Sequence, residues 1–277
     1  MHTHWVHDSD GQTPNQDRVG LVLGAGGEAG GAFIRGALQA LAELAGWHPW
    51  SAQTVIGTSI GALRGARLEA APASQPFADT ATRLRQIASQ LDPLPPLASD
   101  RIVVPGRRVG GRLVALAAPA GKQVANYPVG QPPYHPGLHT VAVRRWTGSR
   151  HVTRLAGSTQ ASRVLYSSAA IPSFSAPVEL EGNTYVDGAV YSPTNADLVT
   201  PSSHDLLIVI APMVTRDGGP WLGRTHRALL VAELAAWRRA AKPTIVVAPR
   251  SADLTSKSDH VAYASIAYDQ VERAVHW

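Results

Sequence analysis

Twice in the first quarter of the chain, a short apolar run ends in glycine and is followed directly by a helical pattern. Val19–Leu23 precedes a glycine-rich segment and a helix expected to end near Gly46. Residues 54–56 precede the sequence Gly-Thr-Ser-Ile-Gly and a second helix. Strands that alternate with helices pair in parallel, and the helices cover both faces of the sheet. The order of elements therefore predicts an α/β fold, a three-layer sandwich with a mainly parallel central sheet.

The later part of the chain continues this pattern less regularly. Strands are expected at residues 138–143, 151–155, 206–210 and 244–248, a hairpin at 178–186, and helices at 224–241 and 260–275. Residues 127–137 contain four prolines, which predicts a loop; a lid and a rim are both open roles for it. No linker divides the chain, so we expect residues 18–277 to form a single domain and residues 1–17 to form a mobile tail.

The composition excludes several classes of protein. Hydrophobic residues make up 44% and charged residues 16% of the 277 residues, a balance that excludes a disordered chain. The absence of cysteine excludes disulfide scaffolds, thiolate metal sites and cysteine nucleophiles. No apolar run is long enough to span a bilayer, and no secretory signal is visible, so we expect a cytoplasmic or peripheral membrane protein.

Charge is distributed unevenly along the chain. Residues 101–178 contain nine arginines, one lysine and no acidic residue, a formal charge of +10, whereas the whole chain carries only +5. Such a segment is typical of a surface that contacts an anionic partner, for example phospholipid headgroups or nucleic acid. The alternative is that these arginines pair with acidic residues from the rest of the chain.

The sequence Gly-Thr-Ser-Ile-Gly stands where the second expected strand meets its helix. Its residues are Gly57, Thr58, Ser59, Ile60 and Gly61. A nucleophilic serine must project from a sharp, strained turn, and the residues two positions away must lack side chains for that turn to close. The sequence predicts a nucleophile elbow with Ser59 as the nucleophile. A glycine-rich turn capped by an ordinary serine remains the alternative.

The glycine-rich residues 24–31 stand between the first strand and its helix, where backbone amides can point at an anion. A dinucleotide fingerprint would need a third glycine at Ala29 and an acidic residue about 20 positions later, and both are absent. The oxyanion of acyl transfer is the other anion, because such loops donate hydrogen bonds to it. An ordinary glycine turn is the third interpretation.

A third motif, Val-Asp-Gly-Ala, follows the expected hairpin and contains Asp187 and Gly188. The preceding strand places Asp187 at a strand end, where the active sites of α/β proteins lie. Gly188 allows the chain to turn away, so the carboxylate can face a cleft. An Asp-Gly turn without further function is the alternative.

Taken in order, the three motifs resemble the patatin-like phospholipase family. Residues 168–172, 177–178, 185–189, 192–193 and 196–198 resemble the later signature of the family. The resemblance covers residues 19–75 and 138–212. It implies a serine acyl hydrolase with a catalytic dyad, in which Ser59 is the nucleophile and Asp187 accepts its proton and later activates water. It also implies an oxyanion hole formed by the amides of Gly26, Gly27 and Glu28.

The glycine loop departs from the family pattern Gly-Gly-Gly-x-Arg/Lys-Gly. Glu28 stands at the third glycine and Gly30 at the basic residue. Backbone amides can still form the hole, but a positive charge is lost and a negative one gained. We therefore expect the change to affect a preference for phospholipids more than hydrolysis itself. Arg35, further along the helix, is a candidate to replace the missing charge.

We expect a lipid carboxylic ester as substrate, cleaved by a phospholipase A, lysophospholipase or general lipid esterase. Residues 101–178 are then expected to contact an anionic membrane surface. We expect no cofactor, no metal and no nucleic-acid partner. One alternative is an α/β-hydrolase with a Ser-His-Asp triad, for which His204, His226 and His260 are the candidate bases. Another is a domain without catalysis that binds lipid or nucleic acid.

Overall fold

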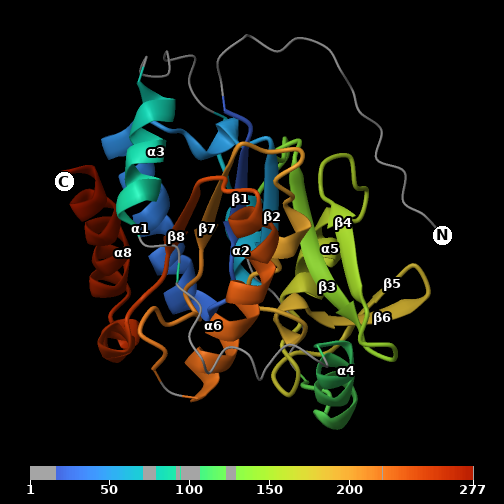
Figure 1. Cartoon of the computed structure of the whole chain (residues 1–277). Coiled ribbons are helices and arrows are strands. Elements are labelled where there is room, and N and C mark those ends of the chain that lie inside the picture. Colours follow the sequence, from blue (N-terminus) through green and yellow to red (C-terminus); the bar gives the residue numbers. More distant parts are fainter. Residues whose placement is uncertain are drawn as a thin grey trace.

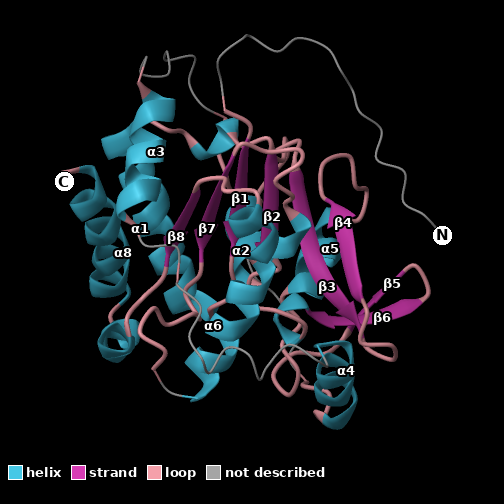
Figure 2. Cartoon of the chain, in the orientation of Figure 1, coloured by secondary structure: helices cyan, strands magenta, loops and turns pink. Residues whose placement is uncertain are grey.

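The computed structural model describes residues 17–70, 79–91, 94, 107–122, 129–219 and 221–276. Eight strands in this part of the chain form one mixed sheet in the order β5-β6-β3-β2-β1-β7-β8, with β4 paired to β3. The strands β3, β2, β1, β7 and β8 are parallel, which confirms the predicted mainly parallel sheet (Figure 2). Their bounds are β1 Val19–Leu23, β2 Thr54–Thr58, β3 Leu138–Arg144, β4 Arg150–Arg154, β5 Val178–Leu180, β6 Asn183–Asp187, β7 Leu206–Ile210 and β8 Thr244–Val247.

Alternate residues of the central strands bury opposite faces of the sheet. Leu21 and Ile208 pack into one hydrophobic core, and Val22 and Leu207 pack into the other. Strands that are buried on both faces read as continuous apolar runs, as these do. The helices are α1 Gly27–Ala45, α2 Ile60–Gly65, α3 Thr80–Gln90, α4 Arg107–Ala117, α5 Ala161–Ser168, α6 Trp221–Glu233, α7 Ala235–Arg239 and α8 His260–Val275.

The helices divide between these two cores. Apolar side chains of α1, α3, α5 and α8 belong to the first core, and those of α6 and α7 belong to the second. In Figure 1, α1, α3 and α8 lie together on the left of the view, near β8, and α6 lies in front of the sheet. The chain is therefore the predicted three-layer α/β sandwich.

Helix ends follow local chemistry. Gly46 adopts a left-handed conformation (φ 66°) and ends α1 at the expected position. Asp259 accepts hydrogen bonds from the amides of Val261 and Ala262 and so begins α8. The helix expected at 224–241 is two helices, because α6 ends at Glu233 and α7 begins at Ala235.

The edge of β3 that faces β2 is shared by two strands in succession. Val141 of β3 pairs with Thr58, the last residue of β2. The next residue, Ala142, pairs with Asp187, the last residue of β6. Because β4 occupies the other edge of β3, β6 continues the edge that β2 leaves. Asp187 is therefore placed beside Ser59, which directly follows β2.

The described part of the loop that precedes β3 lies away from Ser59. This part, residues 129–137, lies at the amino end of β2, where the Gly137 carbonyl accepts from the amide of Val55. His135 of this loop is buried and hydrogen-bonds the Trp50 carbonyl. Ser59 lies at the opposite, carboxyl end of β2, so the proline-rich sequence forms a support for the sheet. Residues 127 and 128 lie outside the described part of the chain.

The expected tail also lies outside the described residues, except for Asp17, which pairs with Arg85 of α3. Among the helices that the structure describes, none is both long enough and apolar enough to cross a bilayer.

Candidate active site

Ser59 lies in a strained turn between β2 and α2. Its backbone has φ 56° and ψ −123°, a conformation that costs a residue with a side chain about 1–3 kcal/mol. Its carbonyl accepts from the amides of Ala62 and Leu63, and the residue is only 4% exposed. This is the geometry that the sequence predicted for a nucleophile elbow.

The two glycines of the motif are required by close backbone contacts. A Cβ atom on Gly57 would lie 2.5 Å from the Cα atom of Ala62. A Cβ atom on Gly61 would lie 2.0 Å from the Leu23 carbonyl oxygen. The second contact also presses the start of α2 against the end of β1, so Gly61 brings the elbow next to the glycine loop. Thr58 and Ile60 complete the turn, and Thr58 is fully buried.

Asp187 is brought to Ser59 from a distant part of the sequence. Its carboxylate accepts a hydrogen bond from the Ser59 side chain and another from the amide of Ala189, at 2.7 Å. The residue is 2% exposed. Burial raises the pKa of Asp187 to about 6, although both hydrogen bonds act to lower it. A carboxylate with this pKa can accept a proton near neutral pH.

The hairpin before Asp187 has the backbone that a tight two-residue turn requires. Glu181 and Gly182 both have positive φ (50° and 71°), as in the turns that connect twisted antiparallel strands. Leu180 pairs with Asn183 across this turn. The turn therefore sets the register that places Asp187 at the end of β6.

The glycine loop lies at the carboxyl end of β1, between β2 and β7. Gly24 donates to the Ile210 carbonyl at 2.9 Å, and Ala25 donates to the Pro193 carbonyl at 2.8 Å. Gly26 precedes α1, and Gly27 and Glu28 form its first turn. The first amides of a helix have no acceptor within it, so these three residues present backbone donors, as an oxyanion hole requires. Among the described residues, no atom lies within 4 Å of where a Cβ atom on Gly27 would be, so there is open space beside this residue.

Two further residues hold the site in place, and neither was given a role from the sequence. The Ser168 hydroxyl accepts from the amide of Ser59 at 3.1 Å and donates to the Val141 carbonyl at 2.7 Å. The Asn195 side chain donates to the Thr58 hydroxyl at 3.1 Å. Ser168 belongs to the later signature of the resemblance, which is the signal that could have indicated it. Both side chains are fully buried.

The candidate histidines lie elsewhere. His204 hydrogen-bonds Thr54 at the start of β2, the end of the strand opposite to Ser59. His226 hydrogen-bonds the Met213 carbonyl, and His260 is exposed at the start of α8. In the part of the chain that the structure describes, no hydrogen bond joins a histidine to Ser59 or Asp187, so a Ser-His-Asp triad has no geometric support. The described residues also contain no group of three potential metal ligands.

The fold and the site define an α/β protein in which a buried serine–carboxylate pair lies beside a glycine loop. A family model for patatin-like phospholipases matches residues 21–200, which is more than half of the chain. The chain belongs to the patatin-like phospholipase family, whose members generally hydrolyse lipid esters. The match spans the glycine loop, the elbow and the Asp187 motif.

A search of the curated proteins finds no match to this chain. Among solved structures, the crystal structure of VipD from Legionella pneumophila matches with 13% sequence identity and a TM-score of 0.43. The alignment covers 95% of this chain and 67% of that one.

Proposed function

We propose that the protein is a serine acyl hydrolase that cleaves lipid carboxylic esters with a Ser59–Asp187 dyad. The observation that carries this proposal is the hydrogen bond between the Ser59 side chain and the buried Asp187 carboxylate. Membership of the patatin-like phospholipase family supports it. No histidine is needed, because Asp187 itself accepts the proton.

In the first half of the reaction, the Ser59 oxygen attacks the ester carbonyl carbon while its proton passes to Asp187. The amides of Gly26, Gly27 and Glu28 donate to the oxyanion, where removing one donor typically costs about 3–4 kcal/mol. The bond to the leaving alcohol then breaks, and Asp187 returns the proton to that alcohol. In the second half, water attacks the acyl-enzyme and transfers its proton to Asp187. The bond between the acyl carbon and the Ser59 oxygen then breaks, which releases the carboxylic acid, and Asp187 returns the proton to Ser59.

The first test is hydrolysis of medium-chain p-nitrophenyl esters. Ser59→Ala and Asp187→Asn should each reduce kcat at least about a thousandfold, because the nucleophile or its base is lost. Ser265→Ala, which changes a serine on α8, serves as the matched control and should retain activity. Turnover like that of the wild type in either dyad variant would remove that residue from the mechanism.

Labelling supplies a second, independent test. A fluorophosphonate probe reacts with activated serine hydroxyls, so we expect the labelled peptide to contain Ser59. Label on another serine, or none on a folded protein, would contradict the dyad. Binding to DNA with a steep salt dependence and no ester hydrolysis would instead indicate a nucleic-acid-binding domain.

We further propose that an anionic membrane docks on an apolar patch formed by Leu113, Val114, Leu116 and Phe174. These side chains are between 37% and 70% exposed. The two segments that carry them are joined where the Ser173 amide donates to the Pro119 carbonyl. They belong to residues 101–178, which carry a formal charge of +10, and this charge complements anionic headgroups.

The patch is close to the dyad. Ala115 of α4 is buried in a small core with Val186, the residue before Asp187. Figure 1 shows α4 beside the adjoining ends of β3 and β6. A membrane bound to the patch would thus lie beside the strand that carries Asp187.

A further inference from the structure

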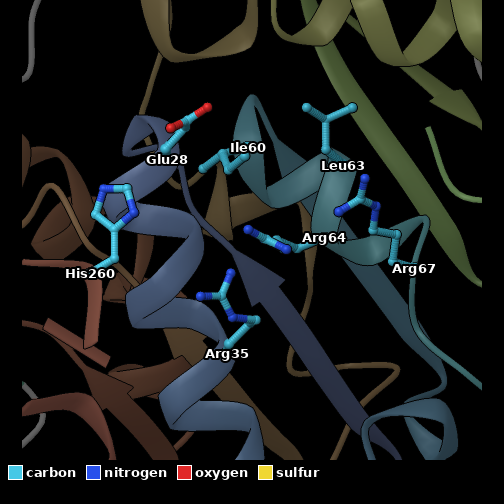
Figure 3. Close-up of a pocket in the computed structure, with 7 residues that line it drawn as sticks. All are labelled: Glu28, Arg35, Ile60, Leu63, Arg64, Arg67 and His260. Carbon is cyan, nitrogen blue, oxygen red and sulfur yellow. The ribbon is translucent and has the colours of Figure 1, made fainter. Parts of the chain in front are cut away.

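A pocket of about 180 Å³ lies between α1 and α2, next to the candidate active site. It is lined by Arg35 of α1, by Arg64 and Arg67 of α2, and by His260 at the start of α8. Glu28 of the glycine loop and Ile60, the residue after Ser59, also line it. Figure 3 shows the guanidinium groups of Arg35 and Arg64 directed into the space between the two helices.

Among the described residues, three arginines and one carboxylate line the pocket. Glu28 forms no ion pair with Arg35 or Arg64 among the described residues. Burial lowers the pKa of Arg64, the charges of Arg35 and Arg67 lower it further, and the charge of Glu28 acts in the opposite direction. Like charges held this close repel each other, and an anion bound among them would relieve the repulsion.

Arg64 also has an unused donor. Its Nε atom is buried and has no hydrogen-bond partner among the described residues. A Cβ atom on Gly31 would lie 2.8 Å from this Nε atom, so the guanidinium group lies against the backbone of α1.

We propose that this pocket binds a phosphate group, held by Arg35 and Arg64 with Arg67 beside them. The planar fork of arginine suits phosphate oxygens, which it contacts with two parallel hydrogen bonds. One water needs only about 10–15 Å³ of such space, so the pocket has room for a phosphate group. Glu28 lies at one end, which favours an anion that binds close to the arginines.

The arginines of the pocket place positive charge next to the glycine loop, which itself lacks the basic residue of the family pattern. Gly30 stands where a basic residue was expected, and it packs against Pro212. Arg64 reaches the neighbouring Gly31 from α2, five residues after Ser59. Two sources can supply the phosphate group: the headgroup of a phospholipid substrate, or free phosphate that acts as an effector.

Binding is tested first without turnover, on the full chain with Ser59→Ala. Thermal unfolding is followed while inorganic phosphate replaces chloride at constant ionic strength. Phosphate should raise the Tm by mass action. Arg64→Gln should weaken the phosphate affinity at least about tenfold, and Arg35→Gln should weaken it several-fold. Arg239→Gln, an exposed arginine on α7, is the matched control.

Arg35 is exposed, so Arg35→Gln leaves the folded structure intact even where Arg64→Gln does not. The proposal is overturned when phosphate and chloride have the same effect on the Tm. It is equally overturned when Arg35→Gln and a folded Arg64→Gln bind phosphate as tightly as Arg239→Gln does. Because these measurements require no hydrolysis, their failure is distinct from failure of the proposed dyad.

The second arm identifies the source and rests on the proposed function. With Ser59 intact, KM is compared for a short-chain phospholipid and for a neutral ester of the same acyl chain. For a headgroup site, Arg35→Gln raises the KM for the phospholipid several-fold relative to the KM for the neutral ester. Inorganic phosphate then competes only with the phospholipid. For an effector site, the ratio is unchanged and phosphate affects both substrates alike.

Discussion

Asp187 is subject to two opposing influences. Burial disfavours its charged form, whereas the hydrogen bonds from Ser59 and Ala189 favour it, and burial has the larger effect, so the pKa rises from 3.8 to about 6. A residue with this balance is suited to exchange a proton with a hydroxyl. The same balance makes the site a source of instability at neutral pH.

Two pH dependences follow from this pKa. Asp187 must be ionised to accept the Ser59 proton, so kcat/KM should fall as the pH decreases through about 6. The folded-state pKa lies above the unfolded value, so the stability that protonated Asp187 contributes is complete below about pH 4 and is lost as the pH rises through about 6.

Asp187→Asn cannot ionise, so the variant should be more stable than the wild type by roughly 3 kcal/mol at about pH 8 and nearly equal to it below about pH 4. Urea unfolding at both pH values measures this difference. An Asp187→Asn variant that is less stable at about pH 8 would contradict the buried, costly carboxylate.

At the scale of elements, the start of α2 and the end of β1 are in backbone contact at Gly61. Gly61→Ala would force the two elements apart, because no side-chain rearrangement can remove a clash with the Leu23 carbonyl. We expect a loss of more than about 3 kcal/mol of stability together with loss of ester hydrolysis.

Gly110→Ala in α4 is the matched control. A Cβ atom there has no neighbour within 4 Å, and alanine favours a helix by about 0.5–1 kcal/mol over glycine. Chemical denaturation of both variants measures the contrast. Equal stabilities would show that the contact at Gly61 can relax at little cost.

The sequence predicted the individual strands and helices better than it predicted which of them lie next to one another. The runs around Leu21 and Ile208 predicted buried strands because both faces of a parallel sheet are apolar. The sequence also predicted that Ser59 follows a strand in a sharp turn and that Asp187 ends a strand, because these positions need particular neighbours. Residues 127–137 were expected to form a loop, and residues 129–137 do, but prolines do not show at which end of the sheet a loop lies. Arg64 was missed, because nothing in its local pattern shows that α1 lies against it.

At the scale of the whole molecule, exposed apolar side chains and net positive charge occur in the same segment, residues 101–178. Monomeric proteins seldom expose neighbouring large apolar side chains without a partner. Helix α4 and the residues around Phe174 therefore form the surface on which we expect lipid to bind, and Asp187 lies at the end of the adjoining strand β6.

Phe174→Ser should weaken binding to phosphatidylglycerol vesicles roughly tenfold or more, since insertion of an aromatic side chain is worth about 1.5–3 kcal/mol. Sedimentation with vesicles measures this. Val261→Ser, which removes another exposed apolar side chain, on α8, should have little effect. Equal losses in both variants would show that exposure alone, rather than this patch, governs lipid binding. Binding should also weaken with added salt.

The shared edge of β3 determines when Ser59 and Asp187 come together during folding. The serine and its base are 128 positions apart, and only the pairing of β3 with both β2 and β6 brings them together. A chain still emerging from the ribosome, or one that has partly opened, contains an ordinary alcohol at position 59. The dyad that we propose therefore forms only once β6 has paired with β3, and a chain that lacks this pairing should not hydrolyse lipid esters.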